Sequence, residues 1–320
     1  TPVWAGGTGV WSGNFTPSLS NNLSIVFTGA GGTATNDIAS GNLSAVGAIT
    51  FNSTAGAYTL NATTGAAGLA GGTPLTVKGD IINNANSTQT IDMNLALLPT
   101  STGIINAVNG NMSAQTYSSN ITISGNISGA GGIIKQGNGS LTLSGANTYN
   151  GTTTVNNGTL TLGAADRIAD TSNLNVAGGT FNLGGFNETL GSITGSGNIT
   201  LGAGNLTTNS TSNSTFSGLI SGTGGLTKNG TSTLTLSGNN TYNGTTTINA
   251  GTIEIAAAGR LGAGNYTGNI SNSGVLVYSG TNNQILGGIL SGSGALTKEG
   301  SGTLTLSNNN TYTGATTINA

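Results

Sequence analysis

The sequence predicts an all-β protein, a right-handed parallel β-helix (β-solenoid) with about 23 residues per rung. Two observations predict it: one block of sequence occurs three times, and apolar residues alternate with threonine inside each copy. Alternation with a period of two points one side chain inward and the next outward. Asn-Gly and Gly-Asn pairs separate the alternating segments, and such residues tolerate positive φ and form turns.

The repeated block is GAGGIIKQGNGSLTLSGANTYNGTTTVNNGTLTL from Gly129, and it returns in related form from Gly222 and from Gly292. The offsets of 93 and 70 residues divide into four and three units of about 23 residues, which is the length of one coil of three short strands with their turns. The residues expected to form the structural core of the repeats are Leu141, Leu143, Val155, Leu234, Leu236, Ile248, Leu304, Leu306 and Ile318.

Two side-chain types recur at fixed places in the copies. Asn147, Asn240 and Asn310 open an Asn-Thr-Tyr tripeptide. They form either a rung ladder of stacked amides, as in cross-β structures, or ordinary turns in which each bonds its own backbone. The lysines of the copies, at 135, 228 and 298, are expected to keep a turn solvated and to discourage unwanted strand pairing.

The domain prediction has two parts. Residues 1–125 form less regular N-terminal rungs, and residues 126–320 form rungs with three repeat copies at 126–165, 219–258 and 289–320. One continuous solenoid is expected, because no linker or break in composition separates the parts. Two alternatives are less favoured. A hairpin array needs no long period, and disorder does not suit a chain that is 35% hydrophobic with a net charge of -2.

Composition excludes several functional classes. The chain has no Cys and no His, which excludes disulfides, Cys/His zinc sites and His-based triads, so no cofactor and no metal are expected. Six scattered basic residues cannot neutralise a run of phosphates, so nucleic-acid binding is not expected. No apolar stretch reaches the roughly 18 residues of a spanning helix, so no membrane insertion is expected. Thr1 is expected to be a mature start, because no secretory signal follows it.

Catalysis is not predicted either, and no catalytic residue is assigned. Glycoside hydrolysis needs two carboxylates roughly 5 to 9.5 Å apart. Asp166 and Asp170 are the close pair among the eight acids, and the related segment of the next copy keeps Arg260 but has neither acid. A solvated loop or helical turn is the favoured interpretation. A polysaccharide-processing β-helix enzyme is the remote alternative.

The block GTLTLSGxNTYxGxTT(I/V)NxGT(L/I) resembles the autotransporter-associated β-strand repeat of passenger regions in bacterial surface proteins. This resemblance implies export to the cell surface, a parallel β-helix, and roles in adhesion, matrix or scaffolding. It implies no catalytic residues. The expected location is therefore extracellular or on the bacterial cell surface.

The predicted function is a non-catalytic extracellular structural protein that forms a rod or fibre, such as a surface filament, sheath or matrix. Ala320 stops within a repeat that the earlier copies continue, so head-to-tail polymerisation by strand addition is expected, with the chain itself as partner. The alternative is a passenger-like adhesin that binds a glycan or a host surface. The residues expected at the contact between subunits are Val3, Trp4, Trp11, Ile318 and Ala320.

Overall fold

The computed structural model describes residues 3–4, 9–10, 24–29, 31–36, 45–62, 74–97, 103–107 and 119–319. It confirms the predicted all-β parallel solenoid, because the strands stack in register and the pairs described are parallel. The chain divides into two compact units. Unit 1 contains residues 1–163 and 167–169, and unit 2 contains residues 164–166 and 170–320. This division lies inside the predicted region 126–320, and the predicted domain boundary near residue 125 stays a prediction.

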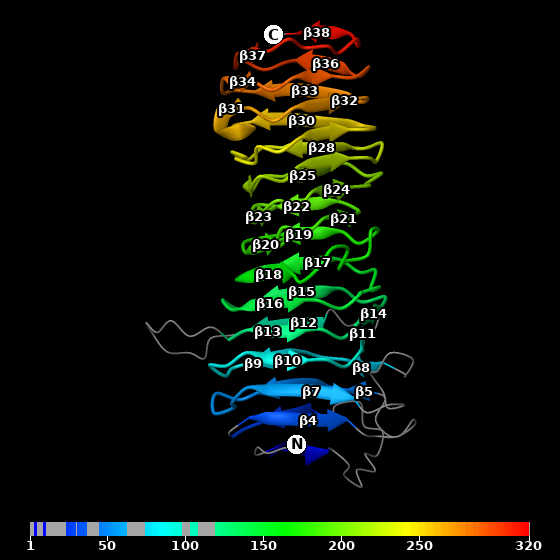
Figure 1. Ribbon diagram of the computed structural model, residues 1–320, viewed down its shortest axis with the longest axis vertical. Helices are drawn as coiled ribbons and strands as arrows, with labels where there is room; N and C mark the ends of the chain where they lie inside the picture. The colour runs from blue at the N-terminus through cyan, green and yellow to red at the C-terminus, as the bar shows by residue number, and fades with distance from the viewer. Residues whose placement is uncertain are drawn as a thin grey trace. The chain divides into compact units, whose positions relative to one another are not determined.

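Unit 1 is built from turns whose strands stack on three sides (Figure 1). Its first sheet contains β1 (Val3–Trp4), β3 (Ser24–Phe27), β6 (Ala48–Phe51), β9 (Ile81–Asn83), β12 (Gly103–Ala107), β15 (Ile133–Gln136) and β17 (Thr153–Val155). Its second sheet contains β2 (Gly9–Val10), β4 (Gly32–Asn36), β7 (Tyr58–Ala62), β10 (Gln89–Ile91), β13 (Ile121–Ile123), β16 (Ser140–Leu143) and β18 (Thr159–Leu162). Its third sheet contains β5 (Ala45–Val46), β8 (Leu75–Val77), β11 (Leu95–Leu97) and β14 (Ile127–Gly129).

Unit 2 repeats this plan. Its first sheet contains β19 (Leu174–Val176), β22 (Ile193–Gly195), β25 (Ser214–Phe216), β28 (Thr233–Leu236), β30 (Thr252–Ala257), β33 (Val275–Gly280), β36 (Ala295–Lys298) and β38 (Thr316–Ile318). Its second side has two short sheets, β20 (Thr180–Asn182), β23 (Asn198–Thr200) and β26 (Ile220–Ser221), then β31 (Asn265–Tyr266), β34 (Gln284–Leu286) and β37 (Leu304–Leu306). Its third sheet contains β21 (Glu188–Leu190), β24 (Leu206–Thr208), β27 (Leu226–Lys228), β29 (Thr246–Ile248), β32 (Ile270–Asn272) and β35 (Leu290–Ser291). A short 3-10 helix, η1 (Gly262–Gly264), precedes β31.

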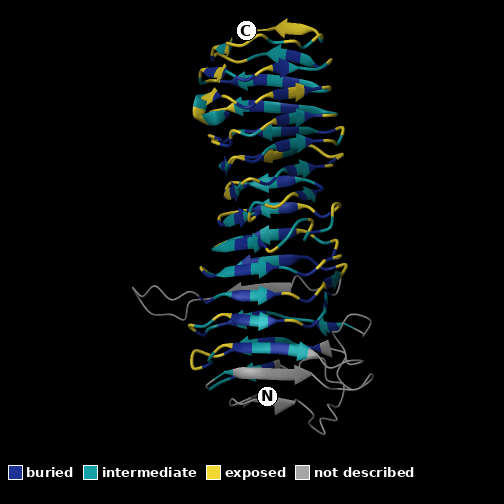
Figure 2. Cartoon of the chain, viewed as in Figure 1, coloured by how far each residue is buried: buried dark blue, intermediate teal, exposed yellow. Residues whose placement is uncertain are grey.

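Burial follows the alternation in the sequence. Most strands have a buried residue on each side of a half-buried one, as in β16, where Leu141 and Leu143 are buried and Thr142 faces outward. Figure 2 shows this alternation as dark and light bands along the strands of each unit. The apolar side chains point into the turn and the threonines point away, because successive side chains of a strand leave opposite faces.

Individual turns are shorter or longer than the predicted average rung of about 23 residues. Bonds between neighbouring turns most often join residues 20 positions apart in unit 2, and 24 positions apart at Thr281. In unit 1 two turns are lengthened, so that bonded residues are 31 or 32 positions apart. The step is variable because the register is set by the strands, while the connecting segments differ in length.

The repeat offsets gave a single rung length because the copies were assumed to begin on the same side. Lys228 of the second copy lies in β27, where Ile248 and Asn272 follow it in register. Lys298 of the third copy lies in β36, one side further around the turn, and pairs with Tyr278 and Ile318. The offset between these two copies therefore contains three complete turns and one additional side.

Glycine at one corner of unit 2 permits the turns to approach closely. A Cβ atom on Gly224 would collide with the carbonyl oxygen of Gly204, and one on Gly244 would collide with the carbonyl oxygen of Gly224. The same conflict recurs at Gly268 and Gly288. Because any larger residue would meet backbone atoms of the preceding turn, this corner requires glycine in each of these turns.

The tyrosine of the Asn-Thr-Tyr tripeptide packs inside the solenoid. The hydroxyl of Tyr242 lies 2.8 Å from Oγ1 of Thr246, and the hydroxyl of Tyr266 lies 2.7 Å from that same atom. The two rings meet edge to face, with centroids 5.5 Å apart. Tyr149 makes the same bond to Thr153 in the first copy, at 2.6 Å. The spacing of tyrosine and threonine in NTYxGTT thus supplies each buried phenol with a partner.

Candidate functional site

The acidic residues do not form a metal cluster in the part of the chain that the structure describes. No group of three or more His, Cys, Asp or Glu side chains is close enough there to hold a metal ion. Asp166 and Asp170 are both exposed. Asp166 has a left-handed backbone (φ 52°), and its N–H donates to the carbonyl oxygen of Asn187 at 3.1 Å. They lie in a turn, as the favoured interpretation of this pair expected.

Other carboxylates are bound to the solenoid itself. Glu254 projects from β30 and accepts a hydrogen bond from Thr235 of the preceding turn at 3.2 Å and one from Ser279 of the following turn at 2.6 Å. Glu188 is buried in β21. Glu254 therefore links three turns.

Among the helices described, none has the length and apolar character needed to cross a membrane.

The asparagine of the tripeptide bonds two neighbouring turns at once. Oδ1 of Asn147 accepts the N–H of Ile127 at 2.8 Å, and its Nδ2 donates to the carbonyl oxygen of Arg167 at 2.7 Å; both partners are 20 residues away. An amide side chain offers one acceptor and a donor group, as a peptide group does. Asn147 therefore replaces strand pairing on the side of the turn where the tripeptide forms no strand.

The second copy shows the same geometry, and the third copy keeps the acceptor half of it. Oδ1 of Asn240 accepts the N–H of Ile220 at 2.9 Å, and its Nδ2 donates to the carbonyl oxygen of Arg260 at 3.2 Å. Oδ1 of Asn310 accepts the N–H of Leu290 at 2.7 Å. Nδ2 of Asn310 donates to the carbonyl oxygen of Asn308 in its own turn at 2.8 Å, and Nδ2 of Asn240 also donates to the carbonyl oxygen of Gly238 in its own turn at 3.0 Å. Each asparagine thus bonds the backbone of at least one adjacent turn. The arrangement is therefore neither a stack of these three amides nor a bond confined to the residue's own backbone.

Buried glutamines act in the same way, and sequence reasoning missed them. Oε1 of Gln89 accepts the N–H of Tyr58 at 2.8 Å, and its Nε2 donates to the carbonyl oxygen of Gly56 at 3.1 Å. Gln284 bonds both backbone groups of Leu261, at 2.8 and 3.0 Å. The signal available in the sequence is an amide residue at an inward position of the alternation, in QTI and QIL.

The lysines of the first two copies are buried, which corrects the expectation of a solvated turn. Lys135 and Lys228 have no exposed surface. Nζ of Lys135 donates to the carbonyl oxygens of Gln136 at 2.7 Å, Gly137 at 2.8 Å and Asn157 at 3.2 Å. Asn157 belongs to the next turn, so this ammonium group joins two turns at their corner. Burial lowers the pKa of Lys135 to about 8 and also lowers the pKa of Lys228.

The third lysine has a more open setting. Nζ of Lys298 donates to the carbonyl oxygens of Glu299 at 2.8 Å and Gly300 at 2.7 Å, and it lies 5.9 Å from the centroid of the Tyr278 ring. The side chain is half-buried. The same corner contact is therefore present in the third copy, with solvent on one side.

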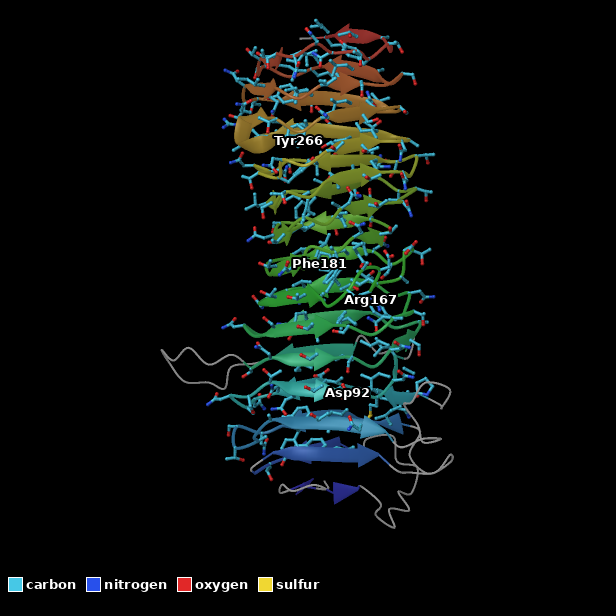
Figure 3. The ribbon with its side chains drawn as sticks, in the orientation of Figure 1. Asp92, Arg167, Phe181 and Tyr266 are labelled. Atoms are coloured by element: carbon cyan, nitrogen blue, oxygen red, sulfur yellow. The ribbon has the colours of Figure 1, made fainter. Side chains whose placement is uncertain are left out.

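The residues predicted for the core fall into two groups. The six from the first two copies, Leu141, Leu143, Val155, Leu234, Leu236 and Ile248, are buried. Leu304 and Leu306 are half-buried, and Ile318 is 70% exposed. The three from the third copy lie in the last turn described. Figure 3 labels Phe181 and Tyr266, two buried side chains of the unit 2 interior.

The residues predicted at a contact between subunits are only partly described. Val3 and Trp4 form β1, which pairs with β3 at Val26 and Phe27. Trp11 and Ala320 lie outside the described residues. Of this set, Ile318 is thus the residue whose side chain is described.

The repeat copies coincide with a known family of sequences. A family model described as Passenger-associated-transport-repeat matches residues 133–162, 226–255 and 296–320, which span β15 to β18, β27 to β30 and β36 to β38. The chain is also 35% identical over 282 residues to a protein named Adhesin BmaC autotransporter, from Brucella suis biovar 1 (strain 1330). The three copies are therefore passenger-type autotransporter repeats.

The passenger repeat and the relative indicate a secreted protein of the cell surface. The alignment covers 78% of this chain and 8% of the relative, so the chain spans a small part of the relative's length. No solved structure matches the chain. The match of the family model to the three copies confirms the resemblance of the NTY-containing block to passenger repeats.

Replacing Asn147 by Ala should weaken the contact between three turns. The N–H of Ile127 would lose its partner, and a buried polar group left unpaired costs about 1 to 3 kcal/mol; the carbonyl oxygen of Arg167 would lose one hydrogen bond. We expect faster hydrogen exchange of the Ile127 amide, together with a lower urea midpoint. Asn150→Ala is the matched control, because Asn150 is exposed in the same loop. Unchanged exchange at Ile127 in Asn147→Ala would contradict the assigned role.

Lys135→Met tests the buried ammonium group. The pKa of Lys135 is lowered from 10.5 to about 8, so between these values the unfolded chain binds more protons and the free energy of unfolding rises with pH. When urea unfolding is measured from pH 7 to pH 10.5, the free energy of unfolding should rise less steeply with pH in Lys135→Met than in the natural sequence. Lys298→Met, at the half-exposed third copy, controls for loss of the side chain. If the free energy of unfolding rose equally with pH in the natural chain and in Lys135→Met, burial would not lower the pKa of Lys135.

Proposed function

We propose that this chain is a non-catalytic passenger segment of a cell-surface adhesin, in which stacked turns display outward side chains to another surface. The observation that carries the proposal is that three passenger-type repeats form stacked turns, to whose neighbours the repeat residues Asn147, Asn240 and Asn310 are bonded. The relative's name, an adhesin autotransporter, supports the same class of function. A surface or host partner is part of this proposal.

The physical support lies in how a solenoid gains stability. Each turn contacts mainly the turns before and after it, so added turns extend the structure without requiring a larger core. The backbone groups between turns are paired by strands, and at corners by Asn147, Asn240, Gln89 and Gln284. A segment of this kind can hold an outer surface at a fixed spacing away from the cell.

The arrangement of the acids supports a non-catalytic role. The carboxylate of Glu254 is occupied by Thr235 and Ser279, and the carboxylates of Asp166 and Asp170 lie in an exposed turn. Glycoside hydrolysis requires two facing carboxylates with a sugar between them. The proposed role therefore rests on binding and display.

Adhesion can be measured directly with the purified chain. Beads that carry residues 1–320 should attach to epithelial cells several-fold more than beads that carry albumin, and soluble chain should compete for attachment. Mild heat that removes the β signal in circular dichroism should abolish the difference. Attachment equal to that of albumin beads on both cells and abiotic surfaces would contradict the proposed function.

We further propose head-to-tail association, with the chain itself as partner. In the described part of unit 2, β38 pairs with β36 on one side. Leu304 and Leu306 are only half-buried beside it, and Ile318 is 70% exposed. Such an edge with apolar side chains can accept another strand. In a longer polypeptide the following turn would occupy the same edge.

Sedimentation velocity tests this association. If β38 accepts a strand from a second copy, the natural chain should sediment faster as its concentration rises, and Ile318→Lys should remove that dependence. Thr317→Lys is the matched control, because Thr317 precedes Ile318 in the same strand and points to the opposite side. A natural chain that remains monomeric at high concentration would contradict the association.

A further inference from the structure

A single file of threonines runs along the second sheet of unit 1. Thr59, Thr90, Thr122, Thr142 and Thr161 are aligned in register from β7 through β10, β13 and β16 to β18. We call these five residues the threonine ladder. At the ~4.8 Å spacing of neighbouring strands it extends over about 19 Å along the axis of unit 1.

The ladder persists although the turns between its members differ in length. Long connections separate Thr59, Thr90 and Thr122, whereas much shorter ones separate the last three members. Each threonine is flanked by two buried residues of its strand. The connecting segments therefore vary, whereas the outward residue does not. Packing of the interior does not require this, because the ladder faces away from it.

The hydroxyl groups of the ladder are available for binding. All five threonines are half-exposed. Within the described residues, none of their Oγ1 atoms hydrogen-bonds to another part of the chain. A row of outward threonines in the third sheet of unit 2 differs, because the hydroxyls of Thr207 and Thr227 there bond Nδ2 of Asn205 at 3.2 and 3.1 Å. Each ladder hydroxyl can donate one hydrogen bond and accept others.

A preference of threonine for strands does not explain the ladder. The first sheet of the same unit has strands with the same burial pattern, yet its outward residues are Val26, Thr50, Ile82, Ile134 and Thr154. Valine, isoleucine and threonine all occur at the outward positions of that sheet, as the strand propensity of β-branched residues predicts. Of the first and second sheets of unit 1, the second has an unbroken row of outward threonines from β7 to β18.

The surroundings of the ladder are small, mostly polar and nearly uncharged. The positions two residues before or after its members hold Ala57, Asn61, Thr88, Asp92, Asn120, Ser124, Ser140, Ser144, Thr159 and Gly163. Asp92 is the charged residue of this set, and its carboxylate accepts a hydrogen bond from Ser124. The exposed large apolar side chains of the described part are Phe186, Ile285, Ile289 and Ile318, all in unit 2.

We propose that the threonine ladder is a docking face for an uncharged, extended polysaccharide that lies along the axis of unit 1. Charge and chemistry favour this occupant. The strands of this face carry no basic residue, and the guanidinium of Arg167 at its border already donates to the carbonyl oxygen of Ser144 at 3.2 Å, so little is available to neutralise a polyanion. A face without large apolar residues offers little to an apolar partner. A chain of sugar rings presents hydroxyl groups at every ring, which match a row of unoccupied donors and acceptors.

The binding depends on the length of the sugar chain. A single exposed hydroxyl contributes little net free energy, because it exchanges a bond to water for a bond to sugar. Several such bonds made by one extended ligand act together, since later contacts form at high effective concentration. The ladder is therefore expected to retain polymers and to ignore monosaccharides. This inference deepens the proposed adhesive function and rests on it.

Depletion of the purified chain onto microcrystalline cellulose and onto insoluble chitin, two uncharged polysaccharides, tests the ladder. The natural chain should bind at least one of them. The double variant Thr122→Val and Thr142→Val should bind about tenfold more weakly, as expected for the loss of two net hydrogen bonds. Valine keeps the branched shape at Cβ while removing the hydroxyl.

The matched control is Thr50→Val with Thr154→Val, on the first sheet of the same unit, which should retain the natural binding. Circular dichroism and melting curves verify that both variants are folded. Equal binding by the two double variants, or no binding to either polysaccharide, would overturn the proposal. So would a change in sedimentation confined to the ladder variant, which would assign the face to a second copy.

The same measurements separate this inference from the proposed function. Beads that attach to cells while the soluble chain ignores both polysaccharides would leave adhesion intact and overturn the ladder as a glycan face. Retention on polysaccharide without attachment to cells would support the ladder and contradict the cell-adhesive role. Preferential retention on alginate, a polyanion, would also overturn the inference.

Discussion

The structure depends on one constraint, which is that every turn must satisfy the backbone hydrogen bonds of the turns beside it. In a parallel sheet the N–H and C=O groups of a strand point at its neighbours, and a buried group without a partner is costly. Strands meet this requirement on the flat sides. Where strand pairing is interrupted or begins, the side chains of Asn147, Asn240, Gln89 and Gln284 also meet it. The abundance of asparagine in this chain therefore has a structural cause as well as a role in turns.

The sequence was sufficient to predict the fold class and the inward residues, because alternation and repetition are local signals. Leu141 and Leu143 are buried as the alternation indicates, and Thr142 between them faces outward. The repeat offsets predict an average rung length, but the length of each individual turn could not be derived from them. Two copies can begin on different sides of the turn, as Lys228 in β27 and Lys298 in β36 do, and the offset then includes a fraction of a turn.

Roles that depend on contacts between turns were harder to predict. A lysine beside glycine and asparagine suggests a solvated turn, yet Lys135 folds its ammonium group onto three carbonyl oxygens. The threonine ladder is likewise invisible without the register, since its members are separated by unequal lengths of chain. In both cases the role of the residue depends on a neighbour from another turn. The sequence of a single repeat copy does not show which residues of the other turns lie beside it.

The placement of the second and third copies on different sides of unit 2 has a consequence for recognition from outside. Equivalent exposed residues of the two copies, such as those around Asn243 and Thr313, leave the solenoid in different directions. An antibody or receptor that recognises the repeat motif would therefore meet it from more than one azimuth on the same molecule. The two copies, although similar in sequence, are thus epitopes that face different directions. Two bulky ligands could therefore bind them at the same time.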